Sequence, residues 1–174
     1  MDLRNKTFLL CLGTQKAGTS WLWDFLKDIP NIDFGSLKEY HVFDRLLFQE
    51  FIREDLKSLE SIADKQKILS NHNLWKRLLM MSNTQEYFNY FCNILNSQTK
   101  NLTGDFTPEY SLLDVDKLRY IKEEFENRNI KTKVIFLMRD PVERIWSADR
   151  MTMRETKRII PLVGSHNSKF VEMF

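Results

Sequence analysis

The feature that most constrains this chain is the stretch from Thr7 to Leu26, TFLLCLGTQKAGTSWLWDFL. It opens on an apolar run, Phe8 to Leu12, which predicts a buried strand. Gly13 and Gly18 then bracket Lys16. A glycine turn between a strand and a helix directs unpaired backbone N–H groups and the positive end of the helix dipole at one point. The stretch therefore predicts an anion-binding loop.

The helix after this loop is expected to be capped by Thr19 or Ser20. Its apolar positions recur at helical spacing: Trp21, Leu22, Phe25 and Leu26. The residue order also separates the loop from that of nucleoside triphosphatases, which ends in Gly-Lys-Ser/Thr and places the hydroxyl on Mg²⁺. Here Gly18 is followed by Thr19, and the lysine lies two residues earlier. A nucleoside-triphosphatase loop is therefore disfavoured.

Composition limits the classes of partner. The 174 residues suit one domain, 1–174, and the net charge is only +2 because 26 basic and 24 acidic residues are interspersed. Anion binding must then be local, and we expect no nucleic-acid partner. Cys11 and Cys92 lack metal-ligand spacing, which indicates reduced thiols and a cytoplasmic setting. No run approaches the ~18 apolar residues of a membrane span, so we expect no membrane partner.

A second strand–loop–helix junction lies near residue 139. The β-branched and apolar run Val134 to Met138 predicts a strand in the sheet interior. Asp140 as N-cap and Pro141 at the first helical position predict a helix immediately afterwards, which leaves Arg139 at the carboxyl end of the strand. Two such junctions belong on adjacent parallel strands, because open α/β sheets bind ligands at that edge. We expect an α/β fold of three α/β/α layers around a central parallel sheet.

The other elements follow from local patterns. Ile32 to Phe34 predicts a short strand closed by Gly35. A capping box at Ser82 predicts a helix to about Ser97, and a further amphipathic helix is expected over Asp114 to Asn127 with Val115, Leu118, Ile121 and Phe125 on one face. The mixed apolar and charged pattern of residues 45 to 81 predicts helical segments that alternate with irregular ones.

The loop resembles a known signature. Lys16-Ala-Gly-Thr-Ser-Trp21 is similar to the Lys-x-Gly-Thr-Thr/Ser-Trp pattern of sulfotransferases that use 3'-phosphoadenosine 5'-phosphosulfate (PAPS). The pair Arg139 and Ser147, eight positions apart, resembles the 3'-phosphate-binding element of the same superfamily. The resemblance covers residues 7–150 and implies a P-loop-like fold, PAPS as co-substrate and no metal. Sulfotransferases of this kind continue further, so the chain is short for the family.

The resemblance assigns roles to the loop residues. The backbone amides of residues 16–20 and the hydroxyls of Thr19 and Ser20 would hold the 5'-phosphate, and Lys16 would stabilise the leaving oxygen. Trp21 resembles an adenine-stacking tryptophan, although burial against the sheet explains it equally well. The residues expected to bind PAPS are Gly13, Gln15, Lys16, Ala17, Gly18, Thr19, Ser20, Trp21, Arg139 and Ser147.

A third segment resembles the acceptor side of heparan-type sulfotransferases. Lys38-Glu39-Tyr-His41-Val-Phe-Asp44 is similar to their Lys-Glu-x-His-Phe-Phe-Asp motif, in which the glutamate is the proposed base. Carried over, Glu39 takes the acceptor's proton, while Lys38 and His41 lie beside the acceptor. A solvated loop with a salt bridge is the alternative. His72 is a second candidate base, because residues 67–72 resemble a strand that ends in a catalytic histidine in cytosolic relatives; a helix-cap histidine explains it as well.

A fourth segment, Asp105-Phe-Thr-Pro-Glu-Tyr110, resembles the Glu-Lys-Ser/Thr-Pro-x-Tyr segment of carbohydrate-type relatives. Asp105 replaces the glutamate and is expected to contact the acceptor. Phe106 replaces the lysine, so one cation of the family pattern is absent.

Together these resemblances predict transfer of a sulfuryl group from PAPS to a hydroxyl or amine, with a small-molecule or carbohydrate acceptor. Two alternative functions stay open: a non-catalytic nucleotide-binding remnant, or a P-loop kinase or hydrolase. The short chain could itself be a fragment, a reduced version of the fold, or part of a homo-oligomer that supplies the missing wall.

Overall fold

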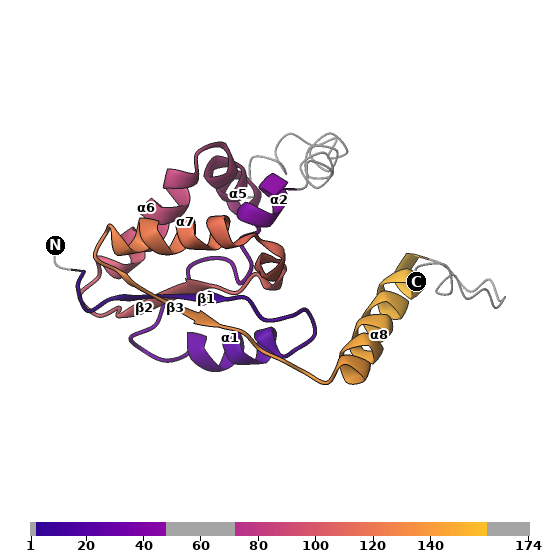
Figure 1. Ribbon diagram of the computed structural model, residues 1–174. Coiled ribbons are helices and arrows are strands. Elements are labelled where there is room, and N and C mark those ends of the chain that lie inside the picture. Colours follow the sequence, from indigo (N-terminus) through magenta and orange to yellow (C-terminus); the bar gives the residue numbers. More distant parts are fainter. Residues whose placement is uncertain (1–2, 48–71, 160–174) are drawn as a thin grey trace. The chain divides into compact units, whose positions relative to one another are not determined.

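A computed structural model describes residues 3–47 and 72–159 (Figure 1). The chain divides into two compact units, Met1–Arg139 and Asp140–Phe174, and each is described by itself. The first unit contains a parallel sheet with the order β2-β1-β3. Within the described residues, the strands of this sheet are β1 (Thr7–Cys11), β2 (Leu102–Asp105) and β3 (Lys131–Ile135). The expected α/β class and parallel sheet are confirmed.

The register of the central strand aligns the carboxyl ends of its two neighbours. Leu10 of β1 lies opposite both Asp105 of β2 and Val134 of β3. Pairing with the third strand continues past Ile135, because the Thr14 amide donates to the carbonyl of Leu137 at 3.3 Å. The expectation that the two junction strands are adjacent and parallel is confirmed.

Helices cover both faces of this sheet (Figure 1). One face packs against α6 (Thr84–Leu95) and α7 (Val115–Glu126), where the rings of Phe8 and Phe125 stack at 3.8 Å. The opposite face packs against α1 (Thr19–Lys27), with Leu9 and Cys11 facing Phe34 and Phe106. The remaining elements of this unit are α2 (Phe43–Leu47), α5 (His72–Ser82) and η1 (Pro108–Leu112).

The first helix differs from its prediction at both its cap and its face. Gly18, with a left-handed φ of 104°, is the N-cap, and Thr19 is the first helical residue and is buried. Trp21 and Phe25 are 70% and 63% exposed and stack on each other. Phe25 therefore does not pack on the sheet as predicted, and burial against the sheet does not explain Trp21. Leu22, Trp23 and Leu26 make that contact instead, because they share the side of α1 on which Thr19 is buried.

Three other predicted elements differ from the structure. The third strand ends at Ile135 rather than Met138, and Val134 is 55% exposed because β3 is an edge strand among the strands described. Ile32–Phe34 forms only an isolated bridge, between Ile32 and Leu102. The capping box is wrong, because α5 extends to Ser82 and the side chain of Asn83 caps α6 by accepting from the Gln85 amide.

Two helix starts are confirmed. Asp114 caps α7 through the Lys117 amide at 2.6 Å, although Val115, expected on the buried face, is 68% exposed. In the second unit, α8 (Pro141–Ile159) starts where the sequence predicts, and Asp140 Oδ1 accepts from the amides of residues 142 and 143. Across residues 3–47 and 72–159, no helix is both long enough and apolar enough to cross a bilayer.

Candidate anion and acceptor site

The loop after β1 is a tight turn whose geometry requires its glycines. A Cβ on Gly13 would lie 2.8 Å from Thr19 Cγ2 and 3.1 Å from Leu137 Cβ. Lys16 and Gly18 both have positive φ, 65° and 104°, and the Ala17 amide closes the turn on the Thr14 carbonyl at 3.1 Å. Since Gly18 has no side chain to cap α1, the first amides of that helix remain suited to an anion.

Arg139 lies directly beside this loop. Its Nη1 donates to the carbonyl oxygen of Lys16 at 3.2 Å. The contact follows from the sheet, because Lys16 comes after β1 and Arg139 comes after the adjacent parallel β3. Two of the residues expected to grip phosphates are therefore neighbours. Ser147 lies on the second turn of α8 (Pro141–Ile159), which belongs to the second unit.

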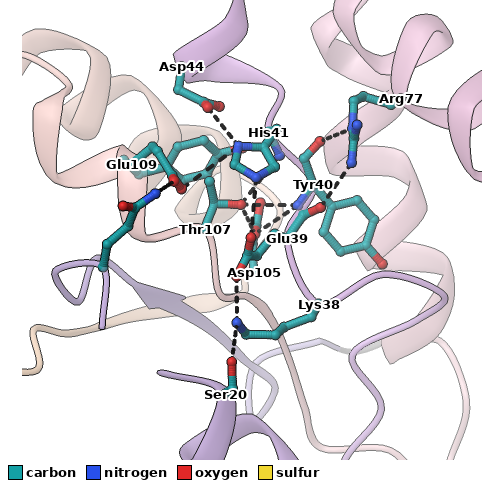
Figure 2. Close-up of polar contacts among 12 residues, drawn as sticks. Ser20, Lys38, Glu39, Tyr40, His41, Asp44, Arg77, Asp105, Thr107 and Glu109 are labelled. Atoms are coloured by element: carbon teal, nitrogen blue, oxygen red, sulfur yellow. Dashed lines mark hydrogen bonds and ion pairs between the residues drawn. The ribbon is translucent and has the colours of Figure 1, made fainter. Parts of the chain in front are cut away.

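The Lys38–Glu39 segment meets the same edge of the sheet. Lys38 Nζ donates to Ser20 Oγ at 2.8 Å and also forms a short ion pair with Glu39 Oε1 (Figure 2). The salt bridge of the alternative interpretation is thus present. It does not stand alone in solvent, however, because Lys38 joins the loop that carries Glu39 to the first turn of α1.

His41 is the centre of a cluster of carboxylates. Its Nδ1 lies 2.7 Å from Asp44 Oδ2 and 3.8 Å from Glu109 Oε2, and its Nε2 lies 3.3 Å from Glu39 Oε2 (Figure 2). The backbone of His41 has a left-handed φ of 52°. Glu109 also accepts from Gln15 Nε2 at 2.5 Å. The 38–41 segment is therefore linked to the start of α1 directly, by Lys38 and Ser20, and to the loop after β1 through Glu109, which contacts both His41 and Gln15.

These contacts shift the pKa of both central groups. Burial acts to raise the pKa of Glu39, but hydrogen bonds from His41 and Lys38 outweigh it and lower the pKa to about 2. Burial acts to lower the pKa of His41, but hydrogen bonds to Asp44 and Glu39 raise it to about 9. At neutral pH Glu39 is a carboxylate and His41 an imidazolium. Glu39 is therefore unprotonated but a weak base, and His41 has no free ring nitrogen to accept a proton.

Asp105 lies beneath residues 38–41 and supports them. It is fully buried; Oδ1 accepts from Thr107 Oγ1 at 2.6 Å and Oδ2 from the Tyr87 hydroxyl at 3.0 Å. Burial raises its pKa to about 6 despite these hydrogen bonds. Thr107 Oγ1 in turn accepts from the amides of Tyr40 and His41. Residues 38–41 cover Asp105, so the carboxylate has no exposed surface for the predicted contact with an acceptor.

Several residues of the site were missed by the sequence analysis. Arg77 donates to the carbonyl oxygens of Tyr40 and Glu39, at 2.9 and 3.3 Å, and no local pattern marks it. Thr107 and Glu109 belong to the Thr-Pro-Glu-Tyr segment that the resemblance covers, so position within that motif is the signal that could have found them. Phe106 packs edge-on against Phe34, away from the charged cluster.

The histidine proposed as a second base does not end a strand. His72 is the exposed first residue of α5, which agrees with the helix-terminus interpretation. Residues 67–71, which supplied the rest of that resemblance, lie outside the described residues.

One set of side chains could hold a metal ion, among the residues that the structure describes. Ligand atoms of Glu39, His41 and Glu109 lie within 4.8 Å of one another. The raised pKa of His41 makes its ring a cation at neutral pH, and Lys38 supplies a second positive charge beside Glu39. These two cations pair with the carboxylates of the cluster, and we interpret it as an ion-pair network.

Comparisons with known proteins do not assign this chain to a family. The scan of family models, the search of curated proteins and the search of solved structures each found no match.

Proposed function

We propose that this chain is a sulfotransferase that moves a sulfuryl group from PAPS to a hydroxyl or amine, with a carbohydrate-like acceptor. The observation that carries the proposal is the 3.2 Å hydrogen bond between Arg139 Nη1 and the carbonyl oxygen of Lys16. It joins two motifs, each of which resembles a phosphate grip, at one edge of a parallel sheet. The P-loop-like sulfotransferase type of fold is part of the same proposal.

The chemistry of the edge suits a nucleotide with two phosphates. The amides at the start of α1, the Ser20 hydroxyl and Lys16 offer hydrogen bonds and positive charge to a 5'-phosphosulfate. The Arg139 guanidinium is able to grip a 3'-phosphate through paired charge-assisted hydrogen bonds. Because the two grips are in contact, one adenosine 3',5'-bisphosphate unit reaches both.

The transfer step uses groups on the same edge. The acceptor's oxygen or nitrogen forms a bond to sulfur as the bond between sulfur and the 5'-phosphate oxygen breaks. Glu39 takes the acceptor's proton, and Lys16 stabilises the negative charge that develops on the departing oxygen. The products are a sulfated acceptor and adenosine 3',5'-bisphosphate.

Transfer of labelled sulfate from PAPS to a panel of sugars, amines, phenols and peptides tests the proposal. We expect transfer by the wild-type chain and none by Lys16→Ala. Lys27→Ala, a surface lysine of α1 that pairs with Asp24, is the matched control and should be fully active. Adenosine 3',5'-bisphosphate without Mg²⁺ should also stabilise the fold, by about 2.7 kcal/mol at a hundredfold excess over its Kd. Greater stabilisation by ATP with Mg²⁺ would instead indicate a kinase or hydrolase.

A second candidate is a nucleotide-binding protein that does not transfer sulfate. Phe106, which stands where the family pattern has a lysine, is fully buried, so this position supplies no cation to a transferring group. Tight binding of adenosine 3',5'-bisphosphate with no transfer to any member of the panel would favour this candidate.

A further inference from the structure

The ammonium group of Lys38 contacts both the Ser20 hydroxyl and the Glu39 carboxylate. Its Nζ donates to Ser20 Oγ at 2.8 Å and pairs with Glu39 Oε1, and its side chain is only 21% exposed. Ser20 is the second residue of α1, at the positive end of the helix dipole, so it is part of the region proposed above for the 5'-phosphosulfate. A single ammonium group is thus shared between the anion site and the proposed base.

The same ion pair weakens Glu39 as a base. Hydrogen bonds from His41 and from Lys38 together hold the pKa of this carboxyl at about 2, against the opposing effect of burial. A carboxylate that is stabilised so strongly has little tendency to take a proton. For Glu39 to act, part of this stabilisation has to be withdrawn, and Lys38 is the partner next to the nucleotide site.

We propose that Lys38 couples nucleotide binding to the base: an anion bound beside Ser20 draws the ammonium group away from Glu39 and leaves that carboxylate able to take the acceptor's proton. This inference rests on the proposed function. The movement needs only rotation about the flexible side chain of Lys38, because Nζ is already within hydrogen-bond distance of the Ser20 hydroxyl. Lys38 is a positioning residue in this scheme, since it acts through Glu39.

A double-mutant cycle on nucleotide affinity tests the coupling. The probe is adenosine 3',5'-bisphosphate in Mg²⁺-free buffer, and calorimetry gives its Kd for the wild-type chain, Lys38→Met, Glu39→Gln and the double variant. If Lys38 has to leave Glu39, Glu39→Gln should tighten binding about two- to fivefold, the size of a partly exposed ion pair. Lys38→Met should weaken binding, and in that background the gain from Glu39→Gln should be clearly smaller than in the wild-type background.

The cycle separates coupling from simple repulsion. Removing the charge of Glu39 also reduces its direct repulsion of the phosphates, but this effect would be equal with and without Lys38. An equal gain in both backgrounds would therefore overturn the coupling and leave the proposed function intact. Should Lys38→Met fail to fold, as judged by its melting curve, Lys38→Gln replaces it, because the amide is polar and uncharged and still offers N–H donors.

A second measurement follows Glu39 itself. Carbon-13 labelling of glutamate carboxyls, assigned with Glu39→Gln, gives the pKa of Glu39 with and without the bisphosphate. We expect the nucleotide to raise this pKa in the wild-type chain, and we expect Lys38→Met to show the raised pKa already in the free protein. A bisphosphate that binds without changing the pKa would contradict the coupling alone. Failure of the bisphosphate to bind at all would overturn both proposals.

Discussion

The guanidinium of Arg139 and the carbonyl oxygen of Lys16 share a 3.2 Å hydrogen bond, although 123 positions separate the two residues in the chain. The bond exists because β1 and β3 are adjacent and parallel, with Thr7 opposite Lys131 and Cys11 opposite Ile135. Loops that leave the same end of neighbouring parallel strands must meet. One cation and one cationic loop are in this way brought to the same point.

Arg139→Ala should reduce affinity for adenosine 3',5'-bisphosphate about tenfold or more, the size of a hydrogen bond to a charged group. The affinity of the Arg139→Ala variant for AMP, which has no 3'-phosphate, should differ little from that of the wild type. Calorimetric titration with both nucleotides provides the measurement. Arg119→Ala, a surface arginine on α7 that pairs with Asp116, is the control and should bind both like the wild type. Equal losses for the two nucleotides would mean that Arg139 only supports the loop through Lys16.

Glu39→Gln should abolish sulfate transfer and keep nucleotide binding at least as tight as in the wild type. The amide retains the shape of the side chain but cannot take the acceptor's proton. Transfer rates and bisphosphate titrations on the same preparation are the measurement, with Glu126→Gln, a surface member of a pair with Lys122, as the control. A fully active Glu39→Gln variant would remove Glu39 from the mechanism.

Thr107→Val should lower the free energy of unfolding by about 1–3 kcal/mol, because Asp105 and two amides lose a buried partner. The matched control is Thr103→Val on β2, which is fully buried and whose hydroxyl has no hydrogen-bond partner within the residues described. That change should be neutral or stabilising. Urea unfolding of both variants gives the comparison, and equal destabilisation would contradict the account of Thr107.

The fold should lose stability as the pH rises from 6.5 to 9. His41 has a folded-state pKa of about 9, above its ordinary value of 6.5, so the folded state holds the proton more tightly. Its contribution is complete below pH 6.5 and is lost as the pH rises through 9, with a slope of at most about 1.4 kcal/mol per pH unit. His41→Asn, which tolerates the left-handed backbone, should remove this slope. Urea unfolding across the range is the measurement, and an unchanged slope in the variant would exclude His41.

Local sequence patterns predicted the junctions well and the exposed surfaces poorly. The glycine turn around Lys16 and the start of α8 at Asp140 depend on backbone preferences of the residues themselves, and both appear where expected. Phe25 and Val115 were expected on buried faces and are exposed, because helical spacing indicates a possible apolar face but not which part of it meets the sheet.

The support of the acceptor loop could not be predicted from local patterns. Asp105 was expected to contact the acceptor, yet it lies buried under residues 38–41, where its neighbours come from α6 and from the segment after β2. Arg77 reaches the same loop from α5. Such contacts depend on how distant elements pack, and a single sequence contains no periodic signal for them.

The central claim is that the Lys16 loop and Arg139 bind the two phosphates of one nucleotide. The most direct measurement is calorimetric titration of the wild-type chain, without Mg²⁺, with adenosine 3',5'-bisphosphate, AMP and adenosine 3'-phosphate. The account predicts that the bisphosphate binds at least about tenfold more tightly than either monophosphate, since each phosphate adds charge-assisted hydrogen bonds. A bisphosphate that binds no more tightly than the better monophosphate would contradict it.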